Sequence, residues 1–128
     1  MLESLGGQEM AMKTQFYATG EREYIAQLTY EREGRAGRGY YASICACDVV
    51  EMPGFGWSFK TTPTDGTYCR ALLVEVKRAS DKAAHKAAEV FDAWCEAYFY
   101  AEGLTADKCT AQEAADLLRR RREQDADD

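Results

Sequence analysis

The sequence has a single histidine, only two prolines and no long apolar run among its 128 residues. A helix that crosses a bilayer needs about 18 or more consecutive apolar residues, so the sequence predicts no membrane-spanning segment. Residues 1–7 lack the basic and apolar regions of a secretory signal. Repeats, heptad arrays and low-complexity tracts are also missing. These absences predict a soluble protein of the cytoplasm.

Cysteine is present, but in no pattern that predicts a disulfide framework or a metal site. The count of five is odd, and the C-x2–4-C knuckle typical of structural zinc sites does not occur. Cys45 and Cys47 would share one face of a strand, where Cys69 or His85 could complete a tetrahedron. Buried, reduced cysteine in a cytosolic protein accounts for the same residues with fewer assumptions. We therefore expect no metal and no cofactor.

Positive charge is in deficit, since 16 Lys and Arg residues stand against 22 Asp and Glu residues and give a net charge of −6. The acidic residues are spread along the chain, which argues against broad phosphate binding. Two local exceptions are basic. They are the glycine-rich segment that carries Arg32, Arg35 and Arg38, and the arginine run 119–122.

The length and the 46% hydrophobic content predict one folded domain rather than a disordered chain. We expect residues 1–12 to be a loose leader and residues 13–103 to form a single α+β domain. Residues 104–123 would add a helix, and residues 124–128 an acidic tail.

Period-two alternation predicts strands at about 14–19, 24–31, 40–51, 57–61 and 68–76. Region 40–51 is apolar on both alternations, as in a central strand that is covered on both faces. Region 68–76 also fits the start of a helix. The β-branched residues there and a helix cap further along the chain favour a strand.

The clearest predicted element is a helix over residues 81–102, with Ser80 as N-cap and Gly103 just past its end. Its apolar stripe comprises Ala84, Ala87, Ala88, Phe91, Trp94, Cys95 and Tyr98. Its opposite side comprises Lys82, Lys86, Glu89, Asp92 and Glu96. A capping box, Thr110 to Glu113, opens a second helix that would bury only Ala114, Leu117 and Leu118. The predicted fold is α+β: an antiparallel β-meander of about five strands, with the long helix packed on one face and a short C-terminal helix.

Residues that could carry catalysis form no recognisable constellation. His85 stands between Ala84 and Lys86, with no Ser or Cys and Asp arranged around it in a triad-like pattern. The glycines of segment 34–39 follow neither the dinucleotide fingerprint nor the P-loop order. We expect no enzymatic activity and no catalytic residue.

Partner binding is predicted at two loops. Arginine and aromatic side chains are enriched at binding hot spots. They occur here as Arg32, Arg35 and Arg38 in one loop, and as Phe55 and Trp57 at a hairpin tip. In a meander these loops lie at opposite ends of strand 40–51, so one partner would have to wrap the domain. Solvated loops with Phe55 folded into the core are the alternative.

The run Ser80-Asp81-Lys82-Ala83-Ala84-His85-Lys86-Ala87-Ala88 follows a β-meander and resembles the start of the last helix of double-stranded-RNA-binding domains. In that family lysines at the start of this helix grip phosphates across the duplex. Ser80, Lys82, Ala84 and Ala88 match in phase, whereas Asp81 and His85 replace two of the family's lysines. The resemblance implies an RNA-binding domain, which is the alternative function.

The size and acidic charge are similar to those of small mobile-element proteins that block nucleic-acid-handling machines, anti-CRISPR proteins among them. Acidic surfaces can occupy basic channels through electrostatic complementarity. The sequence therefore favours a non-enzymatic acidic module that binds a protein partner, as an inhibitor or decoy of a nucleic-acid-handling machine. Nucleic acid as a partner is not favoured by the charge, and no membrane partner is expected.

Overall fold

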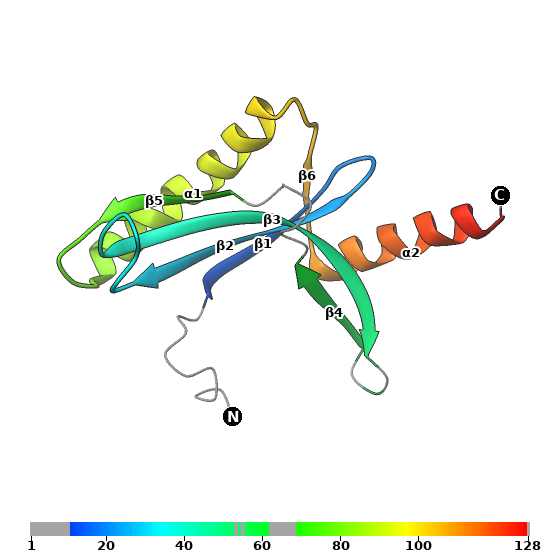
Figure 1. Cartoon of the computed structure of the whole chain (residues 1–128), viewed down its shortest axis with the longest axis horizontal. Helices are drawn as coiled ribbons and strands as arrows, with labels where there is room; N and C mark the ends of the chain where they lie inside the picture. Colours follow the sequence, from blue (N-terminus) through cyan, green and yellow to red (C-terminus); the bar gives the residue numbers. More distant parts are fainter. Residues whose placement is uncertain (1–10, 53, 55, 62–68, 128) are drawn as a thin grey trace.

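Figure 1 shows the computed structural model of the chain, which describes residues 11–52, 54, 56–61 and 69–127. These residues form one sheet and two helices. The strands are β1 (Ala11–Ala18), β2 (Glu23–Glu31), β3 (Gly39–Met52), β4 (Gly56–Thr61), β5 (Cys69–Glu75) and β6 (Asp107–Cys109). The helices are α1 (Asp81–Ala101) and α2 (Ala111–Asp127). The predicted α+β class, with its antiparallel sheet, long helix and C-terminal helix, is confirmed.

The sheet is antiparallel throughout, in the order β4-β3-β2-β1-β6, with β5 also paired to β3. Along one side β3 pairs with β2 over residues 39–47. On its other side it pairs with β5 over residues 39–44 and with β4 over residues 47–52. The last two predicted strands therefore share β3 as a partner, because its 14 residues are long enough for both. Segment 69–75 is a strand, which settles the strand-or-helix alternative.

The short strand β6 was not predicted from the sequence. It pairs with Phe16–Ala18 of β1, and its three residues are too few to show an alternating pattern. At the other end of the domain, β1 begins at Ala11, inside the segment expected as a leader. The sheet thus draws on residues just outside both ends of the predicted 13–103 domain.

Helix α1 lies across one face of the sheet and closes the hydrophobic core (Figure 1). Its residues Ala87, Phe91, Cys95 and Phe99 are buried against inward-facing residues of β1, β2 and β3. Trp94 and Tyr98 of the predicted stripe are half-buried at its edge. Phe99 is the one buried residue of the helix that the predicted stripe omitted, and its ring contacts Tyr17 and Tyr24.

Both ends of α1 are capped as the sequence predicts. The Ser80 side chain accepts a hydrogen bond from the Ala83 N–H at 3.1 Å. At the other end Gly103 has φ +71°, a left-handed conformation that favours glycine. The Gly103 N–H donates to the Tyr100 carbonyl at 3.0 Å, and the Leu104 N–H donates to the Phe99 carbonyl at 2.9 Å. This pair of bonds is a Schellman motif, which fixes the end of the helix.

Helix α2 begins at the predicted capping box. The Glu113 N–H donates to the Thr110 hydroxyl at 3.1 Å, and the Thr110 N–H donates to the Glu113 carboxylate at 2.8 Å. Ala114 and Ala115 are buried, while Leu117 is half-buried. The helix extends from the sheet to Asp127, past the predicted end at residue 123 (Figure 1). In the described part of the chain neither helix is long and apolar enough to cross a membrane.

A polar network joins α1 to the sheet through Asp92, which the helical pattern places on the side opposite the apolar stripe. The Gln15 side-chain amide donates to the Asp92 carboxylate, and the ammonium groups of Lys13 and Lys108 lie 3.6 Å from it. Tyr17 in turn donates to the Gln15 side-chain carbonyl at 2.8 Å. The Gln15 amide, aided by the two lysines, holds the pKa of Asp92 below its usual value of 3.8 despite partial burial.

A carboxylate whose pKa is lowered by folding stabilises the protein above its unfolded pKa, and this contribution is lost as the pH falls through the lower, folded value. We therefore expect Asp92→Asn to reduce stability at neutral pH and to flatten the loss of stability below about pH 4. The measurement is the thermal midpoint between pH 7 and pH 2. Glu96→Gln removes an exposed carboxylate from the same helix and serves as the control. Identical pH profiles for the two variants would contradict this role of Asp92.

Candidate functional site

The predicted partner-binding arginines lie on the tight loop between β2 and β3, residues 32–38. Gly37 has φ +126°, and its N–H donates to the Gly34 carbonyl at 3.0 Å. The Tyr41 hydroxyl accepts the Ala36 N–H at 3.0 Å and donates to the Gly37 carbonyl. These two hydrogen bonds with Tyr41 of β3 fix the backbone conformation of the loop, so its side chains project from a defined position.

The three arginines have different surroundings. Arg38 is a structural tie: its Nε donates to the Arg32 carbonyl at 3.2 Å, and its Nη1 donates to the Lys77 carbonyl at 2.7 Å. The Val76 N–H donates back to the Arg38 carbonyl at 2.9 Å. Arg32 and Arg35 are exposed, and their side chains make no hydrogen bond or ion pair with any residue that the structure describes. These two are therefore available to a partner, whereas Arg38 also holds the loop to the segment after β5.

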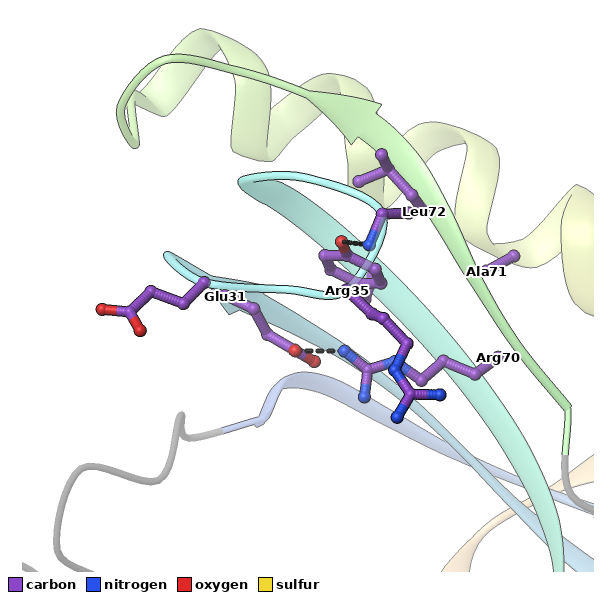
Figure 2. A pocket seen from close by; sticks show the side chains of 8 residues that line it. Glu31, Arg35, Arg70, Ala71 and Leu72 are labelled. Carbon is purple, nitrogen blue, oxygen red and sulfur yellow. Dashed lines mark hydrogen bonds and ion pairs between the residues drawn. The ribbon is translucent and has the colours of Figure 1, made fainter.

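An open cleft of about 740 Å³ lies between this loop and β5 (Figure 2). At its floor the Arg70 guanidinium is paired with the Glu31 carboxylate and lies 4.5 Å from the centre of the Tyr41 ring. Arg35 extends into the same cleft from the loop above (Figure 2). Arg70 is already neutralised by Glu31, so Arg35 is the cation that the cleft offers to a partner. The Tyr41 ring and Leu72 suit a planar or apolar side chain. The lining residues are Glu31, Glu33, Arg35, Ala36, Tyr41, Arg70, Ala71 and Leu72.

The second predicted loop lies at the other end of β3. Trp57 belongs to β4, where it pairs with Glu51, and Phe55 lies outside the described residues. A strand of 14 residues spans about 40 Å, so the arginine loop and the hairpin of Trp57 are far apart. The structure brings Arg32, Arg35 and Arg38 together and does not bring Trp57 to them.

The histidine and the cysteines, which could act in catalysis or bind a metal, occupy ordinary structural positions. His85 is exposed on α1 and lies 3.4 Å from the Glu89 carboxylate one turn further on. Burial raises the pKa of the Cys95 thiol to about 12 and that of Cys109 to about 11. Burial also raises the pKa of Cys45. Among the described residues no group of three or more His, Cys, Asp or Glu side chains is placed to hold a metal ion.

The sequence did not identify Glu31, Tyr41 and Arg70 as members of one cleft. One signal was available: Arg70 interrupts the apolar side of the last predicted strand. It does so because it faces outward, opposite Ser43 in the register of β3 and β5. Its partner Glu31 is 39 residues away in the chain, so only the strand pairing brings the two together.

Comparison with protein-family models, with curated proteins and with solved structures finds no match to the chain.

Proposed function

We propose that the chain is a cytoplasmic, non-enzymatic module that binds a protein partner through the β2–β3 loop. The observation that carries this proposal is the pair Arg32 and Arg35, exposed on a loop whose shape Tyr41 and Arg38 fix. A preformed loop loses little conformational entropy when it binds, and arginine is among the residue types that contribute most at interfaces. The cleft beside the loop gives a partner side chain a place to enter.

The state of the thiols supports a non-enzymatic role. A nucleophilic cysteine needs a lowered pKa and solvent access, because the thiolate is the reactive form. Cys95 is fully buried, and burial raises its pKa to about 12. Cys109 is half-buried, and its pKa is raised to about 11. His85, the single histidine, is exposed on α1 beside Glu89, an arrangement typical of a helix surface.

The charge of the chain supports a narrower proposal, that the partner is a nucleic-acid-handling machine which the module inhibits as a decoy. Acidic residues exceed basic ones by 22 to 16, and outside the arginine loop, residues 32–38, the excess is larger, at 21 to 13. The acidic remainder of the surface, away from the loop, is complementary to a basic channel that would otherwise take nucleic acid, while the arginine loop would contact acidic residues elsewhere on the same partner.

Affinity capture from host lysate, with and without nuclease, tests the proposal. We expect one protein partner to be retained after nuclease treatment and released by high salt. The charge reversal Arg32→Glu with Arg35→Glu should lower its recovery at least about tenfold, because it removes two interface cations and adds two repulsive charges. Arg38 is left unchanged because it holds the loop.

Arg119→Glu with Arg120→Glu makes the same change in net charge on α2 and is the matched control. Trp57→Ala tests the far hairpin separately. Each variant is first checked for folding by circular dichroism. Equal recovery by the loop and control variants would refute binding through the β2–β3 loop. Loss of the partner on nuclease treatment, with direct binding to duplex RNA, would favour the RNA-binding alternative.

A further inference from the structure

Basic residues gather at the end of the molecule where the β2–β3 loop meets the start of α1. In Figure 1 this loop and the connection from β5 to α1 lie at the same end of the sheet. A hydrogen bond from the Arg38 side chain to the Lys77 carbonyl joins the two segments. Segments 32–38 and 76–86 hold seven basic residues against two acidic ones, whereas the rest of the chain holds nine against twenty. We call these seven residues the basic end: Arg32, Arg35, Arg38, Lys77, Arg78, Lys82 and Lys86.

All seven side chains of the basic end are exposed. Within the described residues none of them is paired with a carboxylate. The arrangement differs elsewhere, where Lys13 and Lys108 are paired with Asp92, and Arg70 with Glu31. Several other cations of the protein are therefore neutralised by its own carboxylates, whereas those of the basic end have no carboxylate partner within the described residues.

An apolar hollow of about 310 Å³ lies at the same end. Tyr40 forms its wall and is fixed to the helix cap, because its hydroxyl donates to the Ser80 carbonyl and accepts the Ser80 N–H, both at 3.2 Å. Met12, which is 45% exposed, stands at its edge. The hollow can take one apolar side chain. Arg78 and Lys82 are the chain neighbours of its lining residues Ala79 and Asp81, and Asp81 is the one acidic residue of the lining. The residues that line it are Met12, Tyr30, Tyr40, Ala79, Ser80, Asp81 and Ala84.

We infer that the basic end binds an acidic segment of a protein partner, with an apolar side chain of that segment in the hollow. The inference rests on the proposed function and names the chemistry of the partner. Charge complementarity requires an anionic occupant, and the apolar hollow favours a peptide over a sugar-phosphate backbone. The length of the occupant also favours a peptide. A nucleic-acid duplex carries one negative charge about every 1.7 Å and would extend beyond the basic end onto the acidic remainder of the surface. A short acidic segment can end where the positive charge ends.

The test uses the full chain and a fluorescein-labelled peptide of glutamates with two central leucines, followed by fluorescence anisotropy. A second peptide carries serine in place of leucine, and a short RNA duplex is the third probe. We expect the leucine peptide to bind best and its affinity to fall steeply with salt. Lys82→Glu with Lys86→Glu should weaken binding by about tenfold or more. Arg119→Glu with Arg120→Glu, the matched charge change on α2, should leave it within about twofold.

Three results would overturn the inference: no binding of the leucine peptide at low salt, equal weakening by both double variants, or tighter binding of the RNA duplex than of the peptide. Equal affinity for the leucine and serine peptides would show that no apolar side chain of the peptide binds in the hollow, and would reject that part of the inference. Failure here is distinguishable from failure of the proposed function. A partner captured by the wild type and lost with Arg32→Glu and Arg35→Glu, but retained with Lys82→Glu and Lys86→Glu, leaves the loop as the binding site and rejects the extension of the site to the start of α1.

Discussion

Replacing Phe91 with alanine is expected to lower the free energy of unfolding by about 3–5 kcal/mol. The side chain is fully buried at the centre of the face that α1 presents to the sheet. Its removal would leave a cavity between Ala87 and Cys95, both of which are also fully buried and have small side chains. The Lys13 ammonium, 5.8 Å from the ring centre, would lose its aromatic partner as well.

Urea unfolding followed by circular dichroism measures this loss. Val90→Ala is the matched control, since Val90 is the neighbouring residue and 37% exposed. Alanine has the higher helix propensity, so the control should stay within about 0.5 kcal/mol of wild type. A loss below about 1 kcal/mol for Phe91→Ala, or equal effects at the two positions, would show that α1 packs on the sheet through a different face.

The second large effect is expected from Gly39→Ala, which should destabilise the protein by about 1–3 kcal/mol. Gly39 is the first residue of β3 and pairs with Glu75 of β5. A methyl group there would lie 2.2 Å from the Val74 carbonyl oxygen and 3.0 Å from the Glu75 Cα. These are backbone atoms, so the clash can be relieved only by moving β5 away from β3. That movement would also open the cleft beside the arginine loop.

Thermal and urea unfolding of Gly39→Ala and Gly20→Ala test this close approach. Gly20 is exposed, and an added methyl group there would meet no atom within 4 Å. The control should therefore change stability by no more than about 0.5 kcal/mol. If Gly39→Ala were as stable as Gly20→Ala, β5 would not pair with β3 in this register.

Helix α1 could be predicted almost to the residue because its signals are local. The Ser80 cap and Gly103 bracket a sequence with clear helical periodicity, and the structure places the helix at Asp81–Ala101. The predicted strands rest on a similarly local alternation. Even so, the pairing of both β4 and β5 with β3 was not foreseen, because strand order depends on contacts between distant segments.

The candidate site was only partly predictable for the same reason. The exposed loop arginines are visible in the sequence as three basic residues among glycines. Arg70, which lines the cleft with Arg35, comes from β5, and the other cations at this end of the molecule, Lys82 and Lys86, come from the start of α1. Asp92 lies on the polar side of α1, as helical periodicity predicts, and its side chain is 41% exposed. Its partner Lys108 could not be predicted, because the pairing of β6 with β1 brings that lysine to it.

Site-specific photocrosslinking in the native cells tests most directly whether the end of the molecule at the β2–β3 loop is a protein-binding surface. A photoreactive phenylalanine analogue would replace Arg35 in one variant and Lys82 in a second. In a third it would replace Tyr100, which is 86% exposed on the last turn of α1. We predict a crosslink to the same protein from positions 35 and 82, and none from position 100. Equal crosslinking from all three positions, or adducts with nucleic acid alone, would contradict the account.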